Sequence, residues 1–103
     1  MNGPTPLEHA SAICRYYQQR LKEDATNEEW IIGLETAHAW LDLVREETPD
    51  HQRVENLLAT LFGKNDFGGS AWFDLKLGVR GWTRQLVAKG LIPMEFIRYV
   101  SRL

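Results

Sequence analysis

The most informative segment of this chain is residues 30–44, with the sequence WIIGLETAHAWLDLV. Its apolar side chains recur with alternating spacings of four and three residues, at Trp30, Leu34, Ala37, Leu41 and Val44. This spacing places them along one side of an α-helix. Just before the segment, Thr26 and Glu29 stand three residues apart, which is the pattern of a capping box at a helix start. We therefore predict a helix over residues 27–47.

The apolar side of this predicted helix is unusually wide, because Ile31, Ile32, Trp40 and Leu43 lie beside the main row. Only a narrow acidic line is left, formed by Glu28, Glu35, Asp42 and Glu46. A helix that is apolar around most of its circumference is typically packed on several sides, so we expect it at the centre of the fold. The alternative is that one flank, carrying Trp40 and Leu43, stays exposed and binds a second molecule or a second copy of the chain.

The other helices are predicted from the same spacing and from their end signals. Four are expected, over residues 6–23, 49–62, 70–89 and 93–102, with a main loop at 63–69. Thr5 and Glu8 form another capping-box pattern at the start of the first helix. Gly63 and Gly90 follow predicted helices and are expected to end them in the left-handed conformation.

Residues 70–82 fit two patterns. An alternation of apolar and polar residues from Phe73 to Arg80 is typical of a strand. The same region carries a helical row, and Ser70 can cap a helix that starts there. We favour the helix, because a strand needs a partner and the chain offers no second one. Gly78 and Gly81 are its weakest points, and a break in the helix is expected there if anywhere.

Length and composition indicate one compact domain. The 103 residues are 44% hydrophobic and 25% charged, values typical of globular proteins. The predicted fold class is all-α: a compact single-domain bundle of about five short amphipathic helices over residues 1–103. The lone Cys14 lies in an apolar row, so we interpret it as a core residue and expect a reducing, cytoplasmic location. We recognise no signal peptide and no run long enough to span a membrane.

No pattern of catalytic, cofactor-binding or metal-binding residues stands out, so we expect a protein that is not an enzyme and has no cofactor. The nearest approach is His38, with Glu35 three residues before it and Asp42 four residues after it. A carboxylate beside a histidine can orient a general base. Such a pair is commonplace on exposed helix surfaces, however, and the second pair that a di-metal site requires is missing. We interpret His38 as a structural or solvated residue.

Charge is distributed unevenly along the chain. Residues 1–74 carry six basic and thirteen acidic side chains, a net charge of −7, whereas residues 75–103 carry six basic and one acidic, a net charge of +5. Our first interpretation is that the two parts attract each other within one fold. The alternative is an anionic partner for the basic C-terminal third.

The function that these features favour is protein binding, because arginine and aromatic side chains dominate the binding energy of protein interfaces. We predict a small helical adaptor, inhibitor or accessory subunit that docks on a larger protein or protein complex, with no membrane partner. Its candidate contact residues are Trp40, Leu43, Phe73, Lys76, Arg80, Arg84, Arg98 and Arg102. The alternative is a nucleic-acid-binding regulator that uses the basic C-terminal third against phosphates. The sequence pI of about 5.9 is low for that class.

Overall fold

The computed structural model describes residues 4–63, 67 and 69–101. Along the chain these form α1 (Pro6–Glu23), α2 (Glu28–Val44), α3 (His51–Phe62), α4 (Ser70–Ala88), the short 3-10 turn η1 (Met94–Phe96) and α5 (Ile97–Val100). No strand occurs among the residues that the structure describes. The prediction of a small all-α bundle with five helices is therefore confirmed. Most of the predicted main loop lies outside the described residues.

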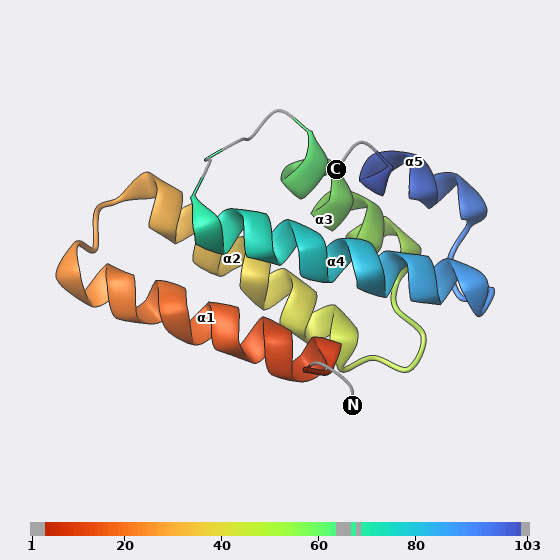
Figure 1. The fold of residues 1–103 in the computed structure, drawn as a ribbon, viewed down its shortest axis with the longest axis horizontal. Coiled ribbons are helices and arrows are strands. Elements are labelled where there is room, and N and C mark those ends of the chain that lie inside the picture. Colours follow the sequence, from red (N-terminus) through yellow and green to blue (C-terminus); the bar gives the residue numbers. More distant parts are fainter. Residues whose placement is uncertain (1–3, 64–66, 68, 102–103) are drawn as a thin grey trace.

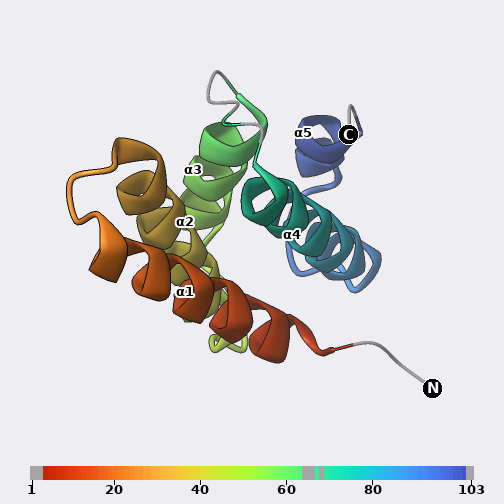
Figure 2. The same ribbon diagram turned by 60° about the vertical axis from the view of Figure 1, so that its left-hand side comes forward.

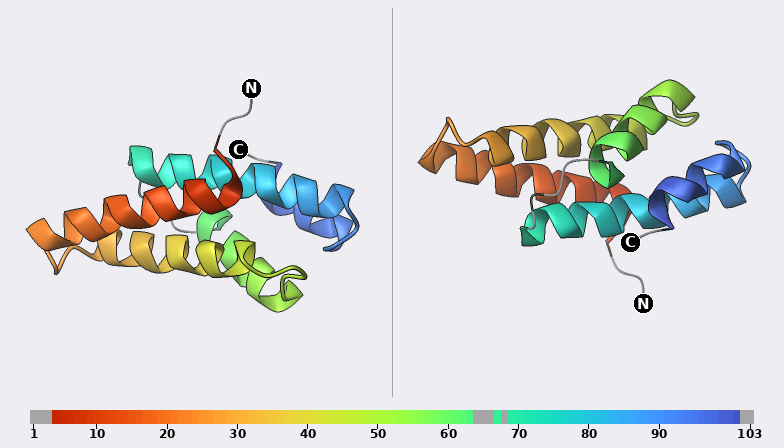
Figure 3. Two further views of the ribbon diagram at one scale, coloured as in Figure 1. Left: turned by 90° about the horizontal axis from the view of Figure 1, so that it is seen from below. Right: turned by 90° about the horizontal axis from the view of Figure 1, so that it is seen from above.

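The helices lie in two layers. Figure 1 shows α1 and α2 as antiparallel neighbours, with α4 running along the same long axis of the molecule. In the turned view of Figure 2, α1, α2 and α3 form one layer, and α4 and α5 form the other. The views from below and above in Figure 3 show α4 lying along this three-helix layer. Accordingly, α4 contacts every other helix and η1.

The hydrophobic core fills the space between the layers. Its largest fully buried side chains include Trp40 of α2, Leu58 and Leu61 of α3, and Trp72 and Leu75 of α4. The helix α2 contacts α1, α3 and α4, which agrees with its wide apolar side and with the expectation that it is central. Large apolar side chains of α2, α3 and α4 thus join the two layers.

The helix α4 is continuous through both of its glycines, so the predicted helix holds and the strand alternative fails. Gly78 allows close packing at this point. A Cβ atom there would lie 2.5 Å from Cη2 of Trp40 and 2.8 Å from the ring of His9. Gly33 does the same in α2, because a Cβ atom there would collide with the ring of Tyr17 in α1. Two helix contacts in the bundle therefore depend on the absence of a side chain.

The starts of the helices follow the predicted signals in part. The capping box of α1 is confirmed: Oγ1 of Thr5 accepts a hydrogen bond from the amide of Glu8 at 3.2 Å, and Oε1 of Glu8 accepts one from the amide of Thr5 at 3.0 Å. The prediction for α2 is wrong by one residue, because Asn27 caps it in place of Thr26. Oδ1 of Asn27 accepts a hydrogen bond from the amide of Trp30 at 3.1 Å.

Other helix boundaries also differ from the predictions. The start of α3 is capped by Asp50, whose side chain accepts a hydrogen bond from the amide of Arg53 at 3.0 Å, so α3 begins two residues later than predicted. Ser70 is the first residue of α4, and Gly69 occupies the cap position without a side-chain hydrogen bond. The predicted helix over 93–102 is reduced to η1 and the four-residue α5.

The two glycines expected to end helices behave differently. Gly90 has a φ of 72°, and the amide of Leu91 donates to the carbonyl of Leu86 at 2.9 Å, which confirms the left-handed ending of α4. Gly63 has a φ of −94°, so the same prediction for α3 is wrong. Glycine is nevertheless needed here, because a Cβ atom at Gly63 would collide with the backbone carbonyl oxygen of Ala59.

Candidate protein-binding surface

Trp40 and Leu43 do not reach the surface of the protein. Their exposed fractions are 0% and 1%. The prediction that they anchor a partner is therefore wrong for this fold. The physical reason is that α3 and α4 pack against the wide apolar side of α2 and cover it. The wide apolar side of α2 is present as predicted, but its side chains Trp40 and Leu43 form part of the core.

The largest exposed apolar side chains of α4 lie in one row on its outer side. Phe73 is 53% exposed and Leu77 is 41% exposed. Gly81 and Arg84 continue the row at intervals of four and three residues, and both are exposed. We call these four residues the α4 face. Two of the predicted contact residues, Phe73 and Arg84, therefore lie together on one exposed surface.

Lys76 and Arg80 border the α4 face and are half-buried. The ammonium of Lys76 lies 6.0 Å from the centroid of the Phe62 ring, at the edge of the range for a cation–π contact. Nε of Arg80 is buried and has no hydrogen-bond partner among the described residues. Their long side chains thus lie partly against the body of the protein.

The predicted contact residues at the end of the chain are separate from the α4 face. Arg98 is exposed on α5, and its Nε donates to the carbonyl of Glu95 at 3.4 Å. Arg102 lies outside the described residues. The structure therefore brings Phe73 and Arg84 together, places Lys76 and Arg80 beside them, and leaves Arg98 on another helix.

The ion pairs do not join the two oppositely charged parts of the chain as our first interpretation required. Within the described ranges they are His9–Asp74, Arg20–Glu23 and Arg53–Glu46. Among the described residues, no ion pair involves Lys76, Arg80, Arg84, Lys89 or Arg98, the basic residues of the C-terminal third.

A polar contact that the sequence analysis did not identify joins α1 to α4. Nε2 of His9 lies 3.0 Å from Oδ2 of Asp74. The imidazole also meets the ring of Trp40 edge-to-face, with the centroids 5.5 Å apart. The signal for this contact was the position of His9 four residues before the buried Ile13, which brings it to the edge of the apolar side of α1.

Two hollows lie between α1 and α4, one on each side of the His9–Asp74 contact. The first has a volume of about 450 Å³ and is lined by residues that include Tyr16 and Phe73. The second has a volume of about 380 Å³ and is lined by residues that include Leu77 and Gly81. Asp74 lines both hollows.

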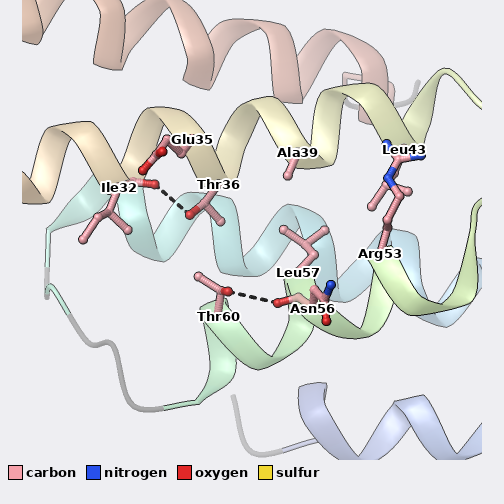
Figure 4. Close-up of a pocket in the computed structure, with 9 residues that line it drawn as sticks. All are labelled: Ile32, Glu35, Thr36, Ala39, Leu43, Arg53, Asn56, Leu57 and Thr60. Carbon is pink, nitrogen blue, oxygen red and sulfur yellow. Dashed lines mark hydrogen bonds between the residues drawn. The ribbon is translucent and has the colours of Figure 1, made fainter.

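A different groove separates α2 from α3 (Figure 4). It has a volume of about 410 Å³, and Leu43 and Leu57 contribute to its lining. Its threonines are satisfied within their own helices: Oγ1 of Thr36 donates to the carbonyl of Ile32 at 2.7 Å, and Oγ1 of Thr60 to that of Asn56 at 2.9 Å. The donor hydrogens of both hydroxyls are thus used within α2 and α3.

Cys14 and His38 lie in different surroundings. Cys14 is buried in the core, and burial raises the pKa of its thiol, so the interpretation as a core residue is supported. His38 is exposed on α2. The described residues contain no group of three or more His, Cys, Asp or Glu side chains placed to hold a metal ion.

Comparisons with known proteins add no identification. Neither a family model, nor a curated protein, nor a solved structure matches this chain. Among the described residues, no helix combines the length and the apolar character needed to cross a membrane.

Proposed function

We propose that this chain is a non-enzymatic interaction protein (an adaptor, inhibitor or accessory subunit) that docks on a larger protein through the α4 face. One observation carries the proposal: Phe73 and Leu77 are exposed one turn apart, with Arg84 on the same side of the helix. Aromatic and arginine side chains are the residue types that contribute most to protein–protein binding energy. Trp40 and Leu43 take no part in this proposal, because they form the core.

The composition of the α4 face favours a protein over a nucleic acid as the partner. Phosphates are bound by rows of cations, and exposed aliphatic residues add little to that contact. The cations of the C-terminal third do not form such a row, because Lys76 and Arg80 are half-buried and Arg98 lies on another helix. Binding of a nucleic acid remains the alternative, and the experiments below are designed to detect it.

Site-specific photo-crosslinking tests the proposal directly. A photoreactive phenylalanine is placed at position 73 and, as a control, at the exposed Gln52 of α3, and the variants are irradiated in the cytoplasm of cells that produce the chain. We expect a discrete cross-linked protein from position 73 that is absent from position 52. Identical products from both positions, or cross-links to nucleic acid alone, would contradict the proposal.

The isolated partner then permits a quantitative test. We expect Phe73→Ala to weaken binding at least tenfold, which corresponds to about 1.4 kcal/mol. Because Phe73 is half-exposed, the same change leaves the free energy of unfolding within about 0.5 kcal/mol of the wild type. Loss of binding without loss of stability separates a contact residue from a structural one.

A further inference from the structure

The groove between α2 and α3, which we call the α2–α3 groove, is a narrow channel with an apolar floor (Figure 4). One side is a row of α2 residues spaced four, three and four positions apart, namely Ile32, Thr36, Ala39 and Leu43. Leu43 and Leu57 line the groove yet are only 1% and 3% exposed, so they lie at its bottom. Its volume of about 410 Å³ falls within the usual range of small-molecule sites, roughly 300–1,000 Å³.

The hydroxyls in this groove can accept hydrogen bonds but have no proton left to donate. Oγ1 of Thr36 donates to the carbonyl of Ile32, and Oγ1 of Thr60 donates to that of Asn56. A hydroxyl has one proton and two lone pairs, so each oxygen keeps only its capacity to accept. Thr36 is 5% exposed, which makes its oxygen an acceptor set deep in the groove. A ligand that meets these hydroxyls must therefore bring the donors.

The net charge of the groove is negative. The ionisable residues in its lining are Glu35 and Arg53. Nη1 of Arg53 donates to the carboxylate of Glu46, which balances its charge. The other side-chain donors in the lining belong to Asn56, whose oxygen accepts from Nε2 of Gln52 at 3.0 Å. Within the described part of the chain, no ion pair involves Glu35, so its carboxylate is the charge left for a ligand to balance.

The acceptors gather at one end of the groove. Figure 4 shows Glu35 and Thr36 of α2 at the end where Ile32 lies, with Thr60 of α3 across from them. Arg53 lies at the other end. A primary ammonium group has three N–H donors and no acceptor, so it matches a place that offers a carboxylate and the lone pairs of two hydroxyls.

We propose that the α2–α3 groove binds a small organic cation, in which a primary ammonium group is carried on an apolar body. The ammonium group lies against Glu35 and the hydroxyl oxygens, and the apolar body covers Ala39 and Leu57. A small molecule is favoured over a protein partner, because no lining residue is a large exposed apolar side chain of the kind found on the α4 face. The inference is independent of the proposed function, since no residue of the α4 face lines this groove.

The test compares three probes that share one apolar body and differ in charge: phenylethylamine, which is protonated at neutral pH, phenylethyl alcohol and phenylpropionate. Each is titrated into the isotope-labelled full chain, and binding is followed by the NMR shifts of the backbone amides. We expect phenylethylamine to bind in the millimolar range and at least about fivefold more tightly than the alcohol, since charge strengthens its hydrogen bonds. The amides that shift are expected to include those of Thr36 and Thr60.

Two matched variants test the role of the carboxylate. Glu35→Gln removes it from the lining, whereas Asp42→Asn removes another exposed carboxylate of α2 that does not line the groove. We expect Glu35→Gln to bind the amine about threefold to fivefold more weakly, as for loss of an exposed ion pair, and Asp42→Asn to bind it within about twofold of the wild type. Ala39→Leu fills the groove and is expected to abolish detectable binding. Circular dichroism and thermal unfolding establish that each variant folds.

Several outcomes would overturn the inference. They are equal affinity for the amine and the alcohol, tighter binding of phenylpropionate, and no binding of any probe. Equal affinity of Glu35→Gln and Asp42→Asn for the amine would overturn it as well, and this comparison stays valid if Ala39→Leu does not fold. Phe73→Ala is expected to bind the amine as the wild type does, and a loss there would place the amine on the α4 face instead. Because partner binding by the α4 face is measured separately, failure of this inference leaves the proposed function intact.

Discussion

Gly78 and Gly81 stand three residues apart in α4, yet their surroundings differ completely. Gly78 is covered by the rings of Trp40 and His9, and Gly81 faces open space. Both cost the helix conformational entropy in the same way. Only the packing around them distinguishes a glycine that the fold needs from one that it does not.

This contrast predicts opposite effects of the same substitution. Gly78→Ala is expected to lower the free energy of unfolding by about 1–3 kcal/mol, because the new methyl group forces the buried Trp40 ring to move. Gly81→Ala is expected to raise it by up to about 1 kcal/mol through helix propensity alone. Urea denaturation of the two variants measures both values. Equal effects of the two changes would show that the rings do not pack as described.

Tyr17 predicts a dependence of stability on pH. Burial raises the pKa of its phenol from 10.0 to about 12 in the native state. Because the unfolded chain releases this proton near pH 10 and the native state retains it, the unfolded state is favoured increasingly from pH 10 to about 12. Stability is therefore expected to fall across that range. Urea denaturation at several pH values measures the slope, and Tyr17→Phe, which removes the proton, should reduce it. An unchanged slope in that variant would assign the effect to other groups.

Among the helices, α2 shows how a cap is selected. Thr26 and Asn27 both suit a cap position, and the sequence pattern with Glu29 pointed to Thr26. In the structure, Oγ1 of Thr26 donates a hydrogen bond to Oδ1 of Asp24 at 2.8 Å. The hydroxyl of Thr26 therefore bonds to a residue before the helix and not to an amide of its first turn. The cap falls to Asn27, which accepts from the amide of Trp30.

The two residues are therefore expected to respond differently to removal of the side chain. Asn27→Ala should destabilise the protein by about 1 kcal/mol, the usual cost of losing an N-cap hydrogen bond. Thr26→Ala should cost clearly less, because its side chain is exposed and bonds only to Asp24. Thermal or urea unfolding measures the difference between them. A larger loss for Thr26→Ala would restore the capping box that the sequence suggested.

The existence and the approximate extent of the helices were predictable from local patterns. Apolar rows, caps and the Gly90 ending act within a few residues, so the sequence alone contains them. The short C-terminal helix was overestimated, because its few turns depend on contacts of α5 with α3 and α4. The break expected in α4 did not occur, because packing on both layers stabilises the helix through its glycines.

For the molecule as a whole, the distribution of charge bears on which of two classes of partner we propose. The described ion pairs leave the cations of α4 without partners in the acidic part of the chain. The cations of the C-terminal third are nevertheless few, with Arg98 on α5 apart from those of α4, and the sequence pI is about 5.9. A surface of this kind is better suited to an acidic protein segment than to a phosphate backbone.

We accordingly expect no effect of duplex DNA on the mass of the protein in solution. Light scattering on a gel-filtration column, at low and at high salt, measures that mass with and without a short duplex. A shift at low salt that disappears at high salt would instead support the nucleic-acid alternative. In that case Arg84→Ala should flatten the dependence of affinity on salt, because one phosphate contact is lost.

The amino-acid sequence was sufficient to predict an all-α domain, the approximate extent of α1 to α4, the buried Cys14 and the mixed aromatic and arginine character of α4. Those properties follow from side-chain spacing, because residues three and four apart share one side of a helix whatever surrounds it. Spacing shows which side is apolar, but it does not show what covers that side.

Burial and pairing across helices required the fold. Trp40 and Leu43 have the same apolar character as Phe73 and Leu77, yet the first two lie in the core and the others at the surface. His9 and Asp74, 65 residues apart in the chain, meet only because α4 packs on α1. Such contacts depend on which helices pack against each other. That arrangement is determined by the shapes of many side chains together.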